Sequence, residues 1–234
     1  MTPRSTGLNS LYALYSSILR ARITPGDTEF QQMIGVLLTT APYHPLCDET
    51  IAELLAGVRP NFVKKWIDDL SSLLYRDEVA NGEIRIRHLS ISDFFFSEDC
   101  HGDYRVSPRD ANTELGIACL KTLVDQLRFN ICNLEDSRMA NADIKDLQSR
   151  IDQNISDALQ YSSLYWSHHL CFTPDNGEER VWARLKEFFD GLHPLFWVEV
   201  LSIMRMVPMG VPNVQRVISW AKVSTGLRLG WIPK

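Results

Sequence analysis

Apolar residues recur every three or four positions over several stretches of the chain, a spacing that predicts amphipathic helices. The first stretch covers residues 8–22 and stops at Thr24-Pro25-Gly26. The second follows Asp27 or Thr28, either of which can cap a helix, and it ends before Pro42 because proline disrupts a helix interior. Two helices are therefore expected before Pro42.

Two more helices are expected between proline and glycine residues. Asp48 can cap the first of them, and Gly57 can end it. Pro60 then stands where the first turn of a helix tolerates proline, and apolar residues follow at helical spacing as far as Leu74. The pattern predicts a helix from Pro60 to Leu74.

A β-hairpin is expected after these helices. Residues 75–79 and 83–88 are short segments, the second of which alternates between apolar and charged residues, and Asn81-Gly82 between them favours a tight turn. Three helices followed by a two-stranded hairpin is the element order of a winged helix, a variant of the helix-turn-helix unit. The sequence therefore predicts a winged-helix domain over residues 27–102.

The end of the hairpin carries the clearest local signals. Ser90 and Asp93 have the S-x-x-D spacing of a helix cap, so we expect them to be structural cap residues, with a loss of about 1 kcal/mol if Ser90 becomes Ala. His88 shares a face of its strand with Ile84 and Ile86. On the residues alone, His88 is more readily interpreted as a buried histidine with a backbone partner than as a ligand-binding group.

The second half of the chain predicts an all-α helical domain over residues 103–223, followed by a tail over residues 224–234. Ser107 can cap its first helix and Pro108 fits the first turn. Further helical patterns lie at 144–155, 159–166, 181–191 and 195–206. A turn is expected at 172–177, and Pro208, Gly210 and Pro212 are expected to break the last helix. Four tryptophans on apolar stripes are expected in the core: Trp66, Trp166, Trp182 and Trp197. The overall fold class is expected to be mainly α, a winged helix followed by a helical domain.

Composition adds limits to this picture. The chain has 234 residues, 45% of them hydrophobic, and a net charge of −5, which is enough apolar content for one or two packed domains. Its longest apolar stretch, residues 195–204, is about half of what a membrane-spanning helix needs. We expect no membrane partner and no secretory signal, and the cytoplasm is the expected compartment.

Signatures of catalysis and of metal binding are absent from the sequence. It contains no phosphate-binding loop, no G-x-G-x-x-G and no nucleophile elbow, so we do not expect an enzyme, and no residue is assigned a catalytic role. The nearest approach to a metal cluster is His168-His169 followed by Cys171, but a first shell needs three or four converging ligands. No metal site is expected. Five cysteines without any C-x-x-C pair indicate reduced thiols.

Charge bears on the usual role of a winged helix, which is DNA binding. The segment 59–87 carries six positive and five negative residues. Asp68 and Asp69 lie on the helix that would enter the major groove, and a phosphate backbone repels them. Nucleic acid is therefore an unlikely partner, although a winged-helix nucleic-acid-binding protein stays the alternative function.

Four segments in the same order resemble fungal NACHT-type signal-transducing NTPases. The segment Arg87 to Phe95 resembles the H-x-S-x-x-D-F-L stretch that closes the winged-helix domain of those proteins, and Leu11 to Leu19 resembles the L-x-x-L-Y-x-x-I-L helix that follows their nucleotide-binding core. The segments Leu127 to Leu134 and Ala158 to Leu170 resemble two stretches of their helical arm. The resemblance covers residues 8–206 and identifies a NACHT/STAND-type, NLR-like region.

The resemblance implies a regulatory function without catalysis. In the family, the winged helix folds over the nucleotide pocket, and its histidine contacts the terminal phosphate of ADP until exchange for ATP. By this resemblance His88 is the nucleotide-contacting residue, and residues 1–26 hold a helix from the end of the NTPase module. No Walker lysine precedes Leu8, so we expect a carboxy-terminal portion of a longer protein, protein partners such as an upstream NACHT-type core, and ADP or ATP only with that core.

Overall fold

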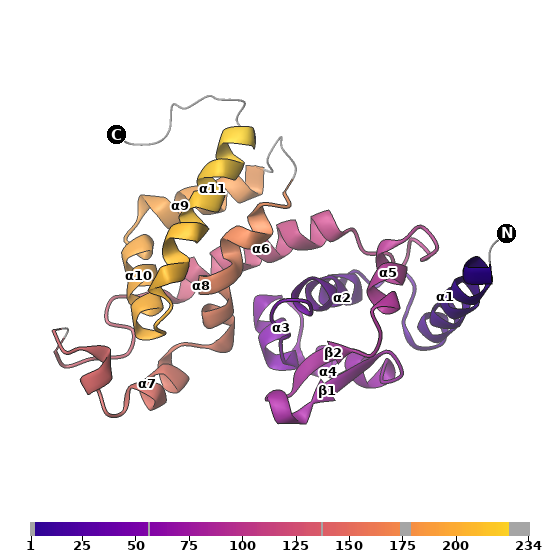
Figure 1. The fold of residues 1–234 in the computed structure, drawn as a ribbon, viewed down its shortest axis with the longest axis horizontal. Helices are drawn as coiled ribbons and strands as arrows, with labels where there is room; N and C mark the ends of the chain where they lie inside the picture. Colours follow the sequence, from indigo (N-terminus) through magenta and orange to yellow (C-terminus); the bar gives the residue numbers. More distant parts are fainter. Residues whose placement is uncertain (1–2, 56, 137, 174–178, 225–234) are drawn as a thin grey trace. The chain divides into compact units, whose positions relative to one another are not determined.

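The computed structural model describes residues 3–55, 57–136, 138–173 and 179–224, and this part of the chain is mainly helical (Figure 1). It contains eleven α-helices and one two-stranded antiparallel sheet. Most of the predicted turn at 172–177 and of the predicted tail at 224–234 lies outside the described residues. A mainly α fold with a small sheet is confirmed.

The chain divides into two compact units, Met1–Ala111 and Asn112–Lys234. The first unit contains α1 (Pro3–Arg22), α2 (Thr28–Thr40), α3 (Asp48–Leu54), α4 (Pro60–Asp69), β1 (Leu74–Asp77), β2 (Glu83–Ile86) and α5 (Ser90–Phe96). The division falls in the first turn of α6 (Pro108–Gln126). The second unit continues with α7 (Leu147–Asn154), α8 (Asp157–Leu170), α9 (Glu179–Asp190), α10 (His193–Ile203) and α11 (Gly210–Ser224).

Local sequence signals explain where several helices begin. The Asp27 carboxylate accepts a hydrogen bond from the Phe30 amide at 3.0 Å and caps α2, as predicted. The prediction that Asp48 caps α3 is wrong, because Cys47 is the capping residue and its side chain makes no cap hydrogen bond. Asp48 lies inside the first turn, where its carboxylate accepts from Arg76 at 2.9 Å.

The helix α4 and the hairpin follow the predicted order, but all three elements differ in length from the prediction. Trp66 and its apolar neighbours on α4 are buried, as expected, but the helix ends at Asp69. Leu74 is not helical, because it already forms the start of β1 opposite Ile86. At the turn, Asn81 has a φ of 53° and Gly82 a φ of 76°, conformations that suit these two residue types.

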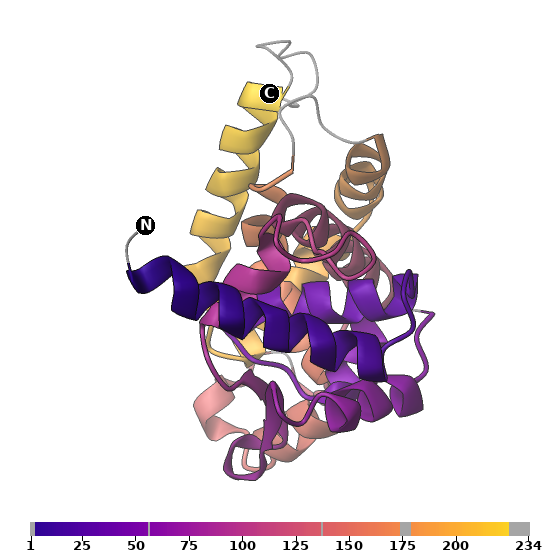
Figure 2. The same cartoon turned by 90° about the vertical axis from the view of Figure 1, so that its right-hand side faces the viewer.

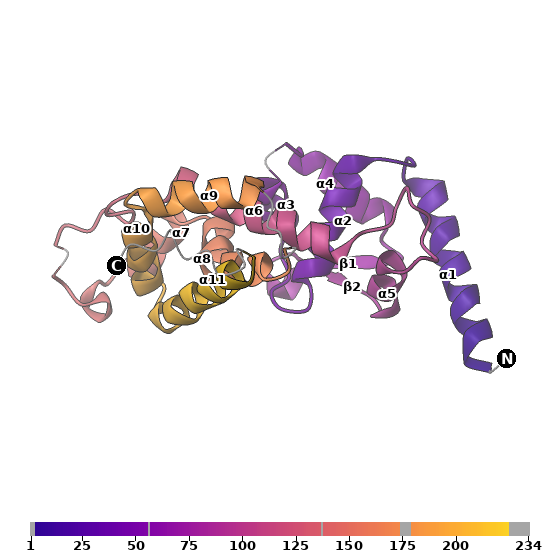
Figure 3. The same cartoon turned by 90° about the horizontal axis from the view of Figure 1, so that it is seen from above.

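The helix α1 is held in the first unit by aromatic packing on α5 (Figures 1 and 3). The Tyr12 ring lies 5.2 Å and the Tyr15 ring 5.6 Å from the Phe94 ring, measured between centroids. All three side chains are buried. Figure 2 shows α1, in indigo, along its length. One face of α1 is therefore part of the core, close to the segment between β2 and α5.

The core of the second unit surrounds α8. Trp166 is fully buried between Phe188 of α9 and Trp197 of α10, with ring centroids 5.4 and 5.9 Å away. The core prediction holds for Trp66, Trp166 and Trp197, whereas Trp182 is half-buried and packs on Trp220.

The helix α11 differs from the sequence prediction. The predicted break after the helix at 195–206 is observed, because α10 ends at Ile203. The pattern does not predict that Gly210 and Pro212 then lie in the first turn of a further helix, α11. A first turn tolerates proline because its amide groups have no partner within the helix. No helix in the described ranges is both long and apolar enough to cross a lipid bilayer.

Candidate functional site

His88 lies in the short segment that joins β2 to α5, and its side chain is exposed. The interpretation of His88 as a buried histidine is therefore wrong. The strand ends at Ile86, so the face shared with Ile84 does not continue to His88. Ile84 alone of these two isoleucines is fully buried. The structure thus places the imidazole at the surface of the first unit.

Two hydrogen bonds to one ring nitrogen fix how this imidazole is presented. The Ser90 amide donates to Nδ1 of His88 at 3.1 Å, and the Ser90 Oγ lies 2.7 Å from the same nitrogen. An amide N–H can only donate, so Nδ1 must be an acceptor. The neutral ring therefore carries its proton on Nε2, an assignment that follows from the hydrogen bonds. The exposed histidine offers an N–H donor to a partner.

Ser90 does not cap α5, contrary to prediction. The capping residue is Leu89, which has no side-chain cap hydrogen bond, and Ser90 is the first helical residue. The Ser90 hydroxyl is buried and lies 2.9 Å from the Tyr15 hydroxyl as well as next to His88. Asp93 lies exposed in the first turn of α5 and supplies no cap either. The S-x-x-D motif therefore does not form a capping box here, and Ser90 instead contacts Tyr15, which is distant in sequence.

The neighbours of His88 are partly tied to other groups. The Arg87 guanidinium donates from Nε to the Ser71 carbonyl at 2.8 Å and lies 5.2 Å from the Tyr75 ring centroid. Leu89 is 75% exposed. His88 thus stands beside an exposed leucine, while the adjacent arginine is held against the hairpin.

Three of the six cations in segment 59–87 are paired with carboxylates. Lys65 pairs with Asp69 on α4. Arg76 pairs with Asp68 at 2.6 Å and with Asp48 at 2.9 Å. On the hairpin, Arg85 pairs with Asp77 at 2.9 Å and with Glu83 at 2.8 Å. These pairs reduce the positive charge that this segment can offer to a phosphate backbone.

The His168-His169 pair, the nearest approach to a metal cluster in the sequence, has another role in the second unit. His169 is buried, its Nδ1 lies 2.9 Å from the Asn112 amide oxygen and its Nε2 lies 2.7 Å from the Tyr161 hydroxyl. Burial lowers the pKa of His169 to about 3, and neighbouring His168 adds to the effect. His168 is half-buried.

Metal ligation and thiol chemistry find no support at these positions. Among the described side chains, no group of three or more His, Cys, Asp or Glu residues could hold a metal ion. Burial raises the pKa of the Cys171 thiol, and the Arg216 charge offsets this only in part. The thiol is therefore not an activated nucleophile.

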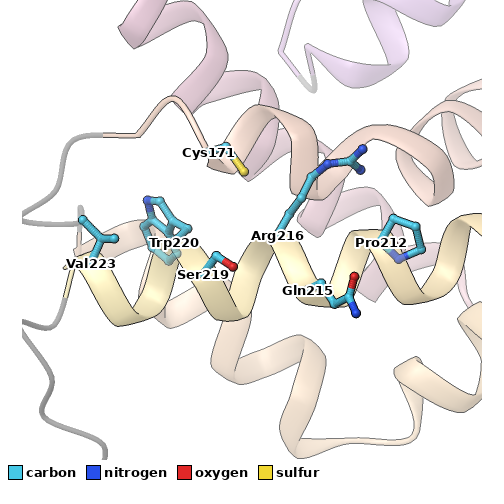
Figure 4. Close-up of a pocket in the computed structure, with 7 residues that line it drawn as sticks. All are labelled: Cys171, Pro212, Gln215, Arg216, Ser219, Trp220 and Val223. Atoms are coloured by element: carbon cyan, nitrogen blue, oxygen red, sulfur yellow. The ribbon is translucent and has the colours of Figure 1, made fainter.

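A groove of about 500 Å³ lies along α11 in the second unit (Figure 4). Cys171 lines it from the end of α8, and the remaining lining residues come from α11: Pro212, Gln215, Arg216, Ser219, Trp220 and Val223. The Trp220 indole donates to the Thr173 carbonyl at 3.4 Å, and Arg216 donates to Asn213 at 3.3 Å. The two groups best suited to bind a ligand are thus engaged in contacts within the unit.

Comparison of the chain with protein-family models, with curated proteins and with solved structures finds no match. The site is therefore judged on its own geometry. The feature that sequence reasoning misses is Tyr15, which lies far from Ser90 in sequence and reaches it through the packing of α1 on α5. No local pattern marks that contact.

Proposed function

We propose that this chain is a non-catalytic regulatory region of a NACHT/STAND-type, NLR-like signal-transducing NTPase. In this proposal, α2 to β2 form a winged-helix domain that covers a nucleotide-bound core. The Nε2–H of His88 donates to a phosphate oxygen of ADP held by that core. The helical second unit then transmits the state of the nucleotide to protein partners.

The observation that supports the proposal most is the way His88 is presented. Its Nδ1 accepts a hydrogen bond from the Ser90 amide at 3.1 Å. In the neutral ring the other nitrogen, Nε2, must therefore carry the hydrogen. The outward Nε2–H is a suitable donor for a phosphate oxygen. The element order of three helices and a hairpin and the four sequence motifs add to this support.

The nucleotide itself belongs to the core and not to this chain. No phosphate-binding loop occurs in the sequence, so ADP or ATP would meet His88 only when a separate core is present. The cytoplasm is the compartment in which such a partner and its nucleotide would be found together.

Nucleic-acid binding is the competing proposal for a winged helix. It is disfavoured because Lys65, Arg76 and Arg85 are already paired with carboxylates. A phosphate backbone gains affinity by releasing counterions from free cations, and paired cations contribute less.

The proposal predicts that the chain raises the affinity of a core for ADP and that His88 carries this effect. The test mixes the full chain with a separately produced NACHT-type core from the source organism, loaded with fluorescent ADP, and measures the dissociation constant of ADP by anisotropy. We expect the chain's enhancement of ADP affinity to be about tenfold to a hundredfold smaller in His88→Ala, which is the effect of losing one hydrogen bond to a charged group.

His101→Ala is the matched control for this measurement. His101 is also exposed in the first unit, and its Nδ1 lies 3.0 Å from the Asp103 carboxylate and 3.3 Å from the Asp103 amide. This variant is expected to behave like the unaltered chain. Equal losses in the two variants, or an ADP affinity that does not respond to the chain, would count against the proposed function.

A further inference from the structure

A continuous polar path connects α1 to His88. The Tyr15 hydroxyl lies 2.9 Å from the Ser90 Oγ, and that oxygen lies 2.7 Å from Nδ1 of His88. Tyr15 and Ser90 are each 6% exposed, whereas His88 is exposed. The path therefore begins in the core of the first unit and ends at its surface.

The number of hydrogens on each group determines which group donates and which accepts in the two contacts of this path. Nδ1 of His88 is an acceptor because it receives the Ser90 amide. The Ser90 hydroxyl has a single hydrogen, which it can give to Nδ1. Its oxygen then accepts from the Tyr15 hydroxyl. Each bond in such a chain polarises the next, which strengthens the contact at Nδ1.

We propose that Tyr15 is a positioning residue for His88 and acts through Ser90, an inference that rests on the role proposed for His88 at a nucleotide phosphate. The hydroxyl is the essential group, because the Tyr15 ring packs on Phe94 at 5.6 Å and would do so without it. Loss of this hydroxyl removes the donor that polarises the Ser90 hydroxyl, which weakens the contact between Ser90 Oγ and Nδ1 while the Ser90 amide still donates to that nitrogen.

The position of α1 then governs the presentation of His88. Hydrogen bonds between hydroxyl groups have oxygen–oxygen distances of about 2.5 to 3.0 Å. Since Tyr15 is carried by α1 and Ser90 by α5, a displacement of α1 along α5 by about one ångström breaks the path. A core that moves α1 would thereby switch His88 between a more strongly and a less strongly held state.

The test is nuclear magnetic resonance of the full chain alone with ¹⁵N-labelled histidine, because the Nδ1 chemical shift reports how strongly that nitrogen accepts a hydrogen bond. In Tyr15→Phe, the Nδ1 resonance of His88 should move toward the value of an unbonded imidazole nitrogen, while the backbone spectrum stays folded. Tyr12→Phe is the control, since Tyr12 also lies on α1 and packs on Phe94. It should leave His88 unchanged.

The route through Ser90 is tested by combining substitutions. Ser90→Ala should shift the same resonance, and adding Tyr15→Phe to Ser90→Ala should cause no further change. An unchanged Nδ1 resonance in folded Tyr15→Phe overturns the inference. So does a Tyr15→Phe effect that persists when Ser90 is replaced by alanine.

These outcomes are separate from those of the proposed function, because the spectra require no core. In the ADP assay, the chain's enhancement of ADP affinity should be about threefold to tenfold smaller in Tyr15→Phe, which is the effect of losing one ordinary hydrogen bond. A core that responds equally to the unaltered chain and to the Tyr15→Phe variant overturns the positioning role. A core that responds to neither contradicts the proposed function, and the spectra still decide whether Tyr15 holds His88.

Discussion

Two histidines in this protein illustrate how surroundings determine what an imidazole can do. His88 is exposed and keeps one nitrogen as acceptor for the Ser90 amide, which leaves the other nitrogen available to a partner. His169 is 1% exposed, and both of its nitrogens face groups of its own unit, Asn112 and Tyr161. The first geometry suits recognition, and the second suits a structural role in the core.

The buried histidine should make the second unit sensitive to acid. The pKa of His169 is about 3 in the folded chain, below the ordinary value of 6.5. Between these values the unfolded chain binds a proton that the folded chain does not, so stability falls as the pH falls below about 6.5. From pH 7 to pH 5 we expect a loss of about 2 kcal/mol in the free energy of unfolding.

Urea unfolding followed by tryptophan fluorescence measures this loss. Five of the six tryptophans follow residue 112 in the sequence, and Trp66→Phe removes the one that reports on the first unit. In this background, His169→Gln should flatten the pH dependence, whereas His101→Gln should retain it. A pH dependence that survives His169→Gln would mean that another group causes it.

At the scale of helices, a single cap has a measurable effect on stability. The Asp27 carboxylate accepts from the Phe30 amide at 3.0 Å at the start of α2, so it satisfies a donor that the helix leaves open. Asp27→Ala should reduce the free energy of unfolding of the first unit by about 1 kcal/mol, measured by urea denaturation followed by circular dichroism.

Asn at the same position separates the cap from simple loss of charge. Asp27→Asn keeps an acceptor oxygen, so its loss should be only a few tenths of a kcal/mol. Glu29→Ala, which removes an exposed charge in the same turn, should likewise have a small effect. If Asn is as damaging as Ala, the hydrogen bond to Phe30 is not what stabilises α2.

The sequence predicts a structural feature correctly where that feature depends on residues close to one another in the chain. Asp27 and Ser107 cap helices because their acceptors lie three residues from the donor amide, and both contacts are observed. The hairpin turn is readable from Asn81-Gly82 because the required backbone angles belong to those residue types.

The wrong predictions share a different cause. Asp48 and Ser90 are residue types typical of caps, but partners distant in sequence, Arg76 and Tyr15, contact their side chains. The predicted break after the helix at 195–206 is observed, but the start of α11 is missed, because the pattern does not show that Pro212 will lie in the first turn of a new helix. The exposure of His88 likewise depends on where β2 ends.

At the scale of the whole molecule, charge bears on the choice between the two functions proposed for the first unit. The chain has a net charge of −5. In the part that would face DNA, Asp68 pairs with Arg76 and Asp69 with Lys65, so carboxylates hold one cation of α4 and one of β1. Proteins that track a phosphate backbone need free cations along one face.

The chain should therefore bind duplex DNA weakly, with a dissociation constant above about 10 μM even at low salt. Fluorescence anisotropy of a labelled duplex measures this, over a series of salt concentrations. The variant Asp68→Asn/Asp69→Asn releases Arg76 from one partner and Lys65 from its ion pair on α4, and it adds two units of positive charge. It should bind more tightly and with a steeper dependence on salt, because each freed cation displaces counterions. Tight, salt-sensitive DNA binding by the unaltered chain would contradict this prediction. It would favour the nucleic-acid-binding function, because such binding requires a basic surface and these ion pairs reduce the number of free cations.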